Sequence, residues 1–225
     1  MSTVSGIVRH AKRWLLPQDR AFRKVMFGPA AGSWMMLDLN HELRLFLGVY
    51  ERELWPSYRT LLRAGMKSFD IGGRDGYSAL LLAKATGNEV VSFECEQSGI
   101  VEMTNVFDRN KLPIRAVQAF VGRPNDPATT MTVDSAAKLF FTPDFMKIDV
   151  EGTEAAVLDG AQNVLSSHRP AMIIEVHGEA AERDCIAILR RHSYTFNIVN
   201  RARFLPEHRP LAHNRWLVCG ADPSA

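Results

Sequence analysis

Four charged side chains crowd the end of one apolar stretch, DFMKIDVEGTE at residues 144–154. Lys147, Asp149, Glu151 and Glu154 follow one another two or three positions apart. Ligands bind at the carboxyl ends of strands in open parallel sheets, so this pattern indicates a site that holds or transfers a proton. A second interpretation stays open: Glu151 and Glu154 can simply favour the positive end of the following helix, while Lys147 pairs with an acid.

A histidine ends the next apolar stretch, where Glu175-Val176-His177 follows a run of aliphatic residues. If a reacting group loses a proton here, His177, Asp149 and Glu151 are the candidates to accept it. The ordinary pKa of histidine lies nearest neutrality, which favours His177. A histidine in this position can also be a hydrogen-bonded structural residue. The sequence pattern does not distinguish the roles of Asp149 and Glu151.

A glycine-rich loop, Asp70-Ile71-Gly72-Gly73-Arg74-Asp75-Gly76, precedes a predicted helix that starts near Tyr77. Such glycines permit a tight turn and let a ligand approach the backbone, although the spacing is not that of the dinucleotide motif G-x-G-x-x-G. Glu94 ends the next predicted strand, where a carboxylate can accept both hydroxyls of a ribose. Loop and acid together predict an adenosine-type ligand.

Short apolar runs alternate with helical segments from Lys67 onward, which is typical of a parallel sheet with crossover helices. The predicted strands are 68–71, 90–94, 114–120, 145–150, 171–176, 195–199 and 216–219, and the predicted helices are 77–85, 98–109, 154–165 and 179–192. No helix is evident between the last two strands, which suggests an antiparallel hairpin. We therefore expect a helical extension over residues 1–64 and an α/β domain over residues 65–225.

The glycine loop, the Phe93-Glu94 strand end and the stretch from Lys147 to Glu154 resemble the FkbM family of S-adenosylmethionine-dependent O-methyltransferases. Leu158-Asp159-Gly160-Ala161 and Glu175-Val176-His177 match the same pattern, as does, more loosely, an upstream run at residues 48–51 that is similar to the pre-domain helix of related bacterial methyltransferases. The chain departs from the pattern at Arg74, where Asn is usual, and at Cys95, where Pro is usual.

The resemblance implies a Rossmann-like class I methyltransferase fold with a seven-stranded, mostly parallel sheet. It implies that S-adenosyl-L-methionine is the cofactor and that the acceptor is a hydroxyl of a sugar, glycan or other polar product. The cofactor-binding residues would be Asp70, Gly72, Gly73, Gly76, Tyr77, Glu94, Gln118 and Asp149, and the catalytic residues His177, Asp149, Glu151 and Lys147. By fold analogy alone, Gln118 would approach the adenine.

Two other functions compete with methyl transfer. Asp149, Glu151, Glu154 and Glu175 offer oxygen ligands suited to magnesium, as a metal-dependent hydrolase would require; we nevertheless assign no metal ligand. A non-catalytic module would retain the cofactor pocket and use the N-terminus to bind a partner. Trp34, Trp55 and Trp216 can stack on a sugar ring, but tryptophans more often anchor cores.

The overall composition is that of an ordinary globular protein, with 46% hydrophobic residues, 23% charged residues and a net charge of +2. This balance does not favour a nucleic-acid partner. Three scattered cysteines without metal-ligand spacing, and no apolar run of membrane-spanning length, favour a cytoplasmic location. Residues 1–30 carry a charge of +5, and apolar residues from Ile7 to Leu15 predict a basic amphipathic helix. It can pack on the domain or a second subunit, or lie on a membrane.

Overall fold

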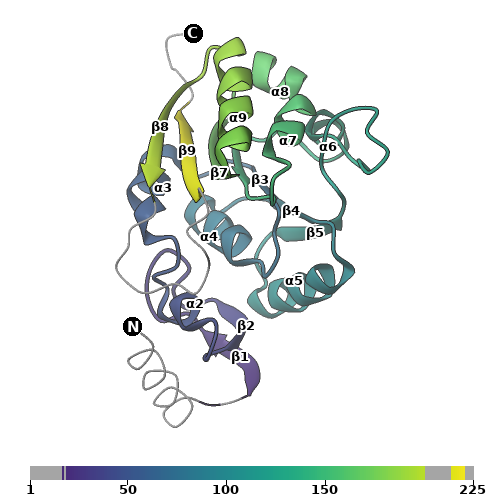
Figure 1. Cartoon of the computed structure of the whole chain (residues 1–225). Coiled ribbons are helices and arrows are strands. Elements are labelled where there is room, and N and C mark those ends of the chain that lie inside the picture. Colours follow the sequence, from purple (N-terminus) through teal and green to yellow (C-terminus); the bar gives the residue numbers. More distant parts are fainter. Residues whose placement is uncertain (1–16, 18, 201–213, 221–225) are drawn as a thin grey trace, which may run out of the picture.

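The computed structural model describes residue 17, residues 19–200 and residues 214–220. Its centre is a seven-stranded sheet with the strand order β5-β4-β3-β6-β7-β9-β8 (Figure 1). Strands β3 to β7 run parallel, and β9 lies antiparallel between β7 and β8. The strands are β3 (Ser68–Ile71), β4 (Val90–Glu94), β5 (Ile114–Gln118), β6 (Phe145–Ile148), β7 (Ala171–His177), β8 (Thr195–Asn200) and β9 (Asn214–Gly220). The predicted sheet and its antiparallel hairpin are confirmed.

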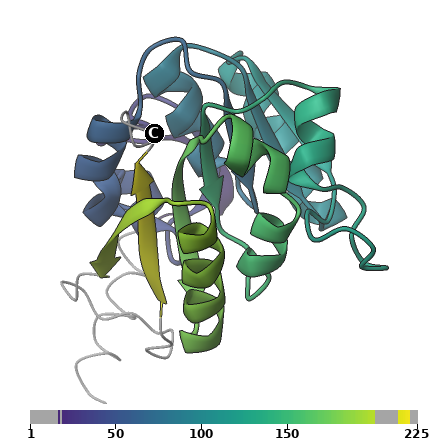
Figure 2. The ribbon, with the colours of Figure 1, turned by 90° about the horizontal axis from the view of Figure 1, so that it is seen from above.

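Helices cover both faces of this sheet, as Figure 2 shows from above. They are α4 (Tyr77–Thr86), α5 (Gln97–Asn110), α6 (Val133–Leu139), α7 (Glu154–Asp159), α8 (Gln162–Ser167) and α9 (Glu179–Arg191). One buried core joins α4, α5 and the N-terminal segment to one face, and a second core joins α6 to α9 to the other. Strand residues alternate between the two cores, since successive side chains point to opposite faces.

Helix α6 was not predicted from the sequence, and one predicted helix is in fact two. Thr132 begins α6 with a capping box, in which its hydroxyl accepts a hydrogen bond from the Ser135 amide. The segment predicted as a single helix over 154–165 is divided into α7 and α8. The Asp134 carboxylate of α6 accepts hydrogen bonds from the amides of Asn163 and Val164, and so caps α8. The break therefore depends on a contact between helices, which periodicity along the chain cannot show.

The N-terminal segment is not purely helical. It contains an antiparallel hairpin of β1 (Arg20–Lys24) and β2 (Trp34–Asp38), followed by α2 (Leu43–Leu47), the 3-10 helix η1 (Arg52–Leu54) and α3 (Trp55–Leu61). The two helices expected between residues 40 and 62 correspond to α2 and α3, with η1 between them. Met35 and Leu37 of β2 are buried in the same core as α4. The predicted basic helix before Pro17 lies outside the described residues.

The helices of the described segments are short, with α5 reaching 14 residues and α9 reaching 13. None of them has the length and apolar character needed to cross a bilayer.

Candidate active site

The glycine loop and the charged strand end meet where the strand order reverses, between β3 and β6. The Asp149 amide donates a hydrogen bond to the Ile71 carbonyl at 2.9 Å. Gly72 has a φ of +90°, and a Cβ atom there would lie 1.9 Å from the Asp149 carbonyl oxygen. Glycine is required because any side chain would push the two strand ends apart. The two predicted parts of the site therefore lie backbone to backbone.

Asp70 lies fully buried on β3, immediately before this contact. Its Oδ2 accepts a hydrogen bond from the Ser92 hydroxyl at 2.7 Å, whereas its Oδ1 has no partner among the described residues. Burial raises the pKa of Asp70 to about 6, because the charged form loses its hydration. A buried acceptor without a partner is costly, so Oδ1 suits a ligand group that donates a hydrogen bond.

Glu94 at the end of β4 is held by backbone amides. Its Oε2 accepts from the Arg74 amide and its Oε1 from the Glu96 amide, each at 2.9 Å. Each carboxylate oxygen has a further lone pair, so the pair of hydroxyls on a ribose can still be accepted. Arg74 adopts a left-handed φ of +46°, a conformation that asparagine tolerates more readily. Gln118, exposed at the end of the neighbouring β5, donates to the Cys95 carbonyl at 3.3 Å.

Tyr77 opens α4 directly after the glycine loop. Its amide donates to the Asp75 carboxylate at 2.9 Å, and its buried hydroxyl has no partner within the described chain. The ring lies edge-on to Tyr50 of the N-terminal segment, with ring centres 5.6 Å apart. Gly73 and Gly76 complete the turn, with the Gly76 amide donating to the Gly73 carbonyl. The predicted cofactor residues thus line one edge of the sheet, and their roles stay predictions.

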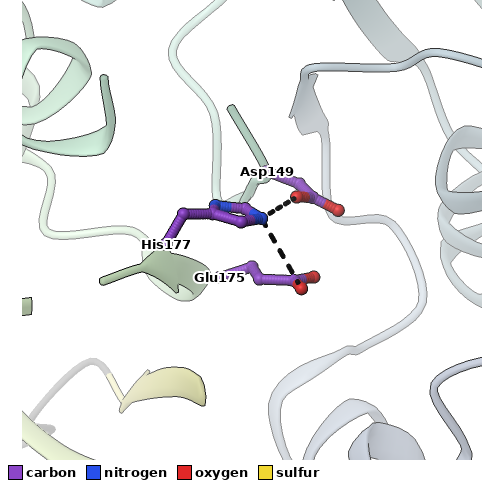
Figure 3. Close-up of side chains that lie close together, drawn as sticks. All are labelled: Asp149, Glu175 and His177. Atoms are coloured by element: carbon purple, nitrogen blue, oxygen red, sulfur yellow. Dashed lines mark ion pairs between the residues drawn. The ribbon is translucent and has the colours of Figure 1, made fainter. Parts of the chain in front are cut away.

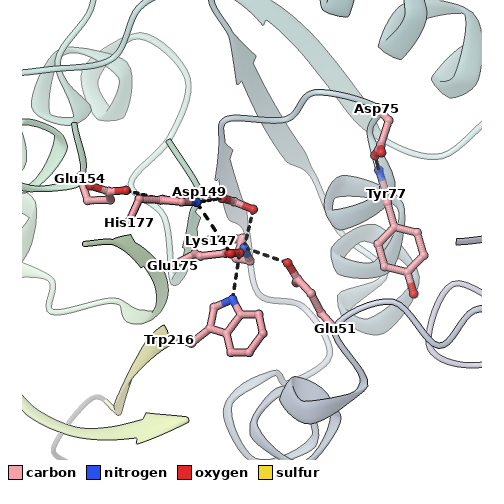
Figure 4. A network of polar contacts seen from close by, with 9 residues as sticks. All are labelled: Glu51, Asp75, Tyr77, Lys147, Asp149, Glu154, Glu175, His177 and Trp216. Atoms are coloured by element: carbon pink, nitrogen blue, oxygen red, sulfur yellow. Dashed lines mark hydrogen bonds and ion pairs between the residues drawn. The ribbon is translucent and has the colours of Figure 1, made fainter. Parts of the chain in front are cut away.

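The second part of the site is a buried network of charged side chains, which we call the acid centre (Figure 4). It comprises Glu51, Lys147, Asp149, Glu154, Glu175 and His177. Lys147 and Asp149 come from the end of β6, Glu175 and His177 from β7, and Glu154 begins α7. Of the four catalytic predictions, the structure brings Lys147, Asp149 and His177 into this network.

Lys147 is completely buried, with its Nζ 3.2 Å from Asp149 Oδ2 and 3.8 Å from Glu51 Oε1. Burial opposes its charge, but the nearby Asp149 and Glu51 outweigh this effect and hold the pKa of Lys147 well above its usual value. Burial likewise opposes the charge on Asp149, yet the cationic Lys147, and His177 when it is protonated, keep the pKa of Asp149 below its usual value. This arrangement keeps Asp149 ionised.

His177 lies between three carboxylates. Its Nδ1 is 2.6 Å from Glu154 Oε1, a strong hydrogen bond to a fully buried acid. Its Nε2 faces Asp149 Oδ1 at 3.8 Å and Glu175 Oε1 at 3.7 Å (Figure 3). The bond to Glu154 raises the pKa of His177, and burial only partly opposes this. With the Nδ1 proton directed to Glu154, Nε2 is the nitrogen that exchanges a proton with a reacting group.

The ligand atoms of Asp149, Glu175 and His177 lie within 4.8 Å of one another, close enough to hold a metal ion. This set differs from the candidate ligands weighed from the sequence, which included Glu154. In the structure Glu154 Oε1 is hydrogen-bonded to His177 and the Gly152 amide, and its buried Oε2 has no partner among the described residues. Glu151 is exposed and takes no part in the network among the described residues, so its catalytic role stays a prediction. Trp216 is buried, and its indole donates to Glu175 Oε2 at 3.0 Å, so it is not placed to stack on a sugar.

Glu51 was assigned no role from the sequence. It lies in a stretch of helical periodicity between Tyr50 and Leu54, where a glutamate is expected to face solvent. In the structure it is buried, and burial raises its pKa to about 8 although Lys147 opposes the rise. No spacing along the chain connects Glu51 with Lys147, because the two belong to elements that meet only in the folded protein.

Comparison with known families and structures shows what this site resembles. Residues 123–205 match the family described as Methyltransferase FkbM domain, which confirms the predicted resemblance over the stretch that carries most of the acid centre. The glycine loop lies outside the matched residues. Among curated proteins, no sequence matches the chain.

Several solved structures share the fold. The C-terminal domain of precorrin-6Y C5,15-methyltransferase from Rhodobacter capsulatus has a TM-score of 0.54 and 18% identity, over 75% of this chain and 87% of that one. Methyltransferase FkbM from Methylobacillus flagellatus KT has a TM-score of 0.53 and 23% identity, over 70% of this chain and 45% of its own. Aeropyrum pernix fibrillarin, with natively bound S-adenosyl-L-methionine, has a TM-score of 0.53 and 14% identity, over 70% of this chain and 67% of that one. These matches confirm the class I methyltransferase fold.

Proposed function

We propose that the chain, a methyltransferase with an FkbM domain over residues 123–205, transfers a methyl group from S-adenosyl-L-methionine to a hydroxyl of a sugar, glycan or other polar product. One observation carries the proposal: the contact between Gly72 and the Asp149 carbonyl joins the glycine loop to the acid centre. An adenosine-type ligand on the loop would therefore place its reactive end beside groups that accept a proton. The acceptor class rests on the family resemblance.

The residues at the sheet edge suit this cofactor. Glu94 would accept the ribose hydroxyls, and the orphan Oδ1 of Asp70 would accept a hydrogen bond from the amino-acid end. Tyr77 and the glycines would bound the same pocket, with Gln118 toward the adenine and Asp149 at the methyl end. When bound, S-adenosyl-L-methionine supplies a methyl group on a positively charged sulfur, which leaves as a neutral thioether.

His177 is the proposed base. Nε2 of His177 would take the proton of the acceptor hydroxyl as its oxygen bonds to the methyl carbon and the carbon–sulfur bond breaks. The Glu154 carboxylate, 2.6 Å from Nδ1, stabilises the imidazolium that forms. Asp149, kept ionised by Lys147, would orient the hydroxyl and add to the negative potential that favours the imidazolium. Asp149 and Glu151 are the remaining candidates if Nε2 is not the acceptor.

The first test is a calorimetric titration of ligand-stripped protein with S-adenosyl-L-methionine, in EDTA and then with added magnesium. Micromolar binding without metal is expected. Absence of binding in both conditions would reject the proposed cofactor. Binding only with magnesium would assign Asp149, Glu175 and His177 to a metal instead.

The second test is transfer of a labelled methyl group to a panel of free sugars, glycans and nucleotide sugars. His177→Ala should lower turnover by about 10²–10⁴-fold, which is typical for loss of a general base. Its affinity for S-adenosyl-L-methionine should change little. Full turnover in this variant across neutral pH would move the proton to Asp149 or Glu151.

A location in the cytoplasm and the absence of nucleic-acid partners are also proposals. The former is supported by three cysteines that are all free, including the exposed Cys95, and the latter by the balanced charge. We propose that the basic N-terminus contacts a membrane or a second subunit. Removal of residues 1–17 should then change the sedimentation or membrane association of the protein, but not its affinity for the cofactor.

A further inference from the structure

One member of the acid centre comes from outside the α/β domain. Glu51 belongs to the turn between α2 and η1, which we call the 48–51 turn. Its side chain is 5% exposed, with Oε1 3.8 Å from Lys147 Nζ, and it is hydrogen-bonded to Glu175. Figure 4 shows this side chain reaching Lys147 from the side opposite Asp149 and His177. The N-terminal segment therefore completes the acid centre.

The backbone of the 48–51 turn is held in an unfavourable conformation by its neighbours. Glu51 has a φ of 45° and a ψ of 36°, the left-handed region that side chains other than glycine, asparagine and aspartate rarely adopt. Gly48 packs so tightly that a Cβ atom would lie 1.8 Å from the Phe27 carbonyl, and the Met26 amide donates to the Phe46 carbonyl at 2.8 Å. Such strain persists where the surrounding structure enforces it, and it gathers at functional sites.

Glu51 helps to keep Lys147 charged, but Asp149 already pairs with Lys147 at 3.2 Å, so charge balance alone does not require an acid at position 51. Asp149 and Glu175 already face Lys147, so a third carboxyl group adds repulsion and desolvation cost, and an apolar side chain would be cheaper to bury. A carboxyl group that shares a proton with Glu175 avoids the repulsion, which agrees with the raised pKa of Glu51. Its length allows it to reach both Lys147 and Glu175.

The same turn also touches the cofactor side. Tyr50 lies edge-on to Tyr77, the first residue after the glycine loop. The turn thus contacts residues of both the proposed cofactor pocket and the acid centre.

We propose that the 48–51 turn is the acceptor-side wall of the transfer site. We further propose that Glu51 is its positioning residue, which holds Lys147 and Glu175 so that Asp149 and His177 are correctly placed for an acceptor hydroxyl. This inference rests on the proposed methyl transfer. In this inference Glu51 acts through its hydrogen bonding and the length of its side chain, not through negative charge.

Two variants separate these properties. Glu51→Gln keeps the reach and loses the charge, whereas Glu51→Asp keeps the charge and loses one methylene of reach. We expect kcat within about threefold of wild type for Glu51→Gln and at least about tenfold lower for Glu51→Asp, because small displacements of positioned groups are costly. The KM for S-adenosyl-L-methionine should stay unchanged in both. Glu89→Gln is the control for loss of an acidic charge. Glu89 directly precedes β4, pairs with Lys67 and belongs to neither part of the site.

The reverse order, with Glu51→Asp active and Glu51→Gln inactive, would overturn the inference, as would wild-type kcat in both. If Glu51→Asp does not fold, Glu51→Leu replaces it. The same loss of kcat is expected, and activity that persists in Glu51→Leu would overturn the inference.

If the wild type binds the cofactor but methylates no acceptor, the proposed function fails separately. The ring nitrogen shifts of His177 in ¹⁵N-histidine protein then decide: they should move in Glu51→Asp and not in Glu51→Gln, and unmoved shifts in both would reject the role.

Discussion

The glycine loop and the acid centre lie against each other but are built in different ways. In the glycine loop and at the adjacent end of β4, side chains are held by nearby backbone amides. The Tyr77 amide donates to Asp75, and the Glu96 amide donates to Glu94. In the acid centre, side chains hold other side chains from separate elements, such as His177 on Glu154 and Trp216 on Glu175. Local sequence can therefore specify the first region, whereas the second exists only once four parts of the chain have packed together.

The two regions also differ in how charge is balanced. Each oxygen of Glu94 already accepts a backbone amide, so this acid is stable before any ligand binds. The acid centre balances several carboxyl groups with the buried Lys147 and with His177. Removing one charged partner should consequently be much more damaging in the acid centre than in the glycine loop.

The largest effect is expected for Lys147→Met. Loss of the buried cation would leave Asp149 facing other carboxyl groups, and breaking a buried pair from one side typically costs about 3–5 kcal/mol. Urea denaturation monitored by circular dichroism measures the free energy of unfolding. Lys67→Met, which removes a partly exposed pair with Glu89, should cost only about 0–1 kcal/mol. Equal losses of stability in the two variants would show that the buried ion pairs of the acid centre contribute no more to stability than an exposed pair.

Gly72→Ala should come next, because it acts on the contact between the two regions. The methyl group would meet the Asp149 carbonyl, and the backbone would be strained at a φ of +90°, with a combined cost of about 2–4 kcal/mol. Gly87→Ala has a φ of +66° but open space around it, so it isolates the strain at about 1–2 kcal/mol. If both variants lose the same stability, the close approach of loop and strand is not supported.

Glu94→Ala tests the glycine-loop region alone. Loss of a charged hydrogen-bond acceptor should weaken binding of S-adenosyl-L-methionine by about 1.5–3 kcal/mol, or roughly 10–150-fold, in a calorimetric titration. Glu96→Ala, an exposed acid two residues away, should bind normally. Unchanged affinity in Glu94→Ala would contradict the placement of the ribose.

Glu154→Gln keeps the side-chain length and an oxygen that can accept from His177 Nδ1, so we expect it to appear mainly as a change in the pH dependence of activity. The bond to Glu154 raises the pKa of His177 above its ordinary value of 6.5, and a base must be neutral to accept a proton. Activity of the wild type should therefore rise with pH through a midpoint above 6.5, and Glu154→Gln should move this midpoint to lower pH. If the midpoint of this rise in activity does not move in Glu154→Gln, the rise reports the titration of a group other than His177.

The raised pKa of His177 also makes the free energy of unfolding depend on pH. Because the pKa of folded His177 is raised, its bond to Glu154 stabilises the fold fully below the pKa of the unfolded chain. That contribution is lost as pH rises through the raised value. Activity and this part of stability therefore change in opposite directions with pH.

Much of the α/β domain was predictable, because parallel strands buried on both faces appear as short apolar runs that are easy to find. The strand ends were less certain: β5 ends at Gln118 and β6 at Ile148, two residues earlier than expected. The hairpin of β1 and β2 was missed because its apolar residues, such as Met35 and Leu37, are buried only through packing against the domain. The segment 133–139 became a helix through its cap at Thr132, a signal too short to stand out.

The sheet, the glycine loop and the placement of Lys147, Asp149 and His177 at neighbouring strand ends follow from periodicity and from residues close together in the chain. Packing between distant elements sets Glu154 against His177, brings Glu51 into the acid centre and leaves Glu151 outside the network of described contacts. These features do not follow from the order of residues, because burial and pairing of charge depend on which elements meet in space. A carboxylate has the same chemistry at every position of a sequence, and only its surroundings in the fold decide whether it is solvated, paired or protonated.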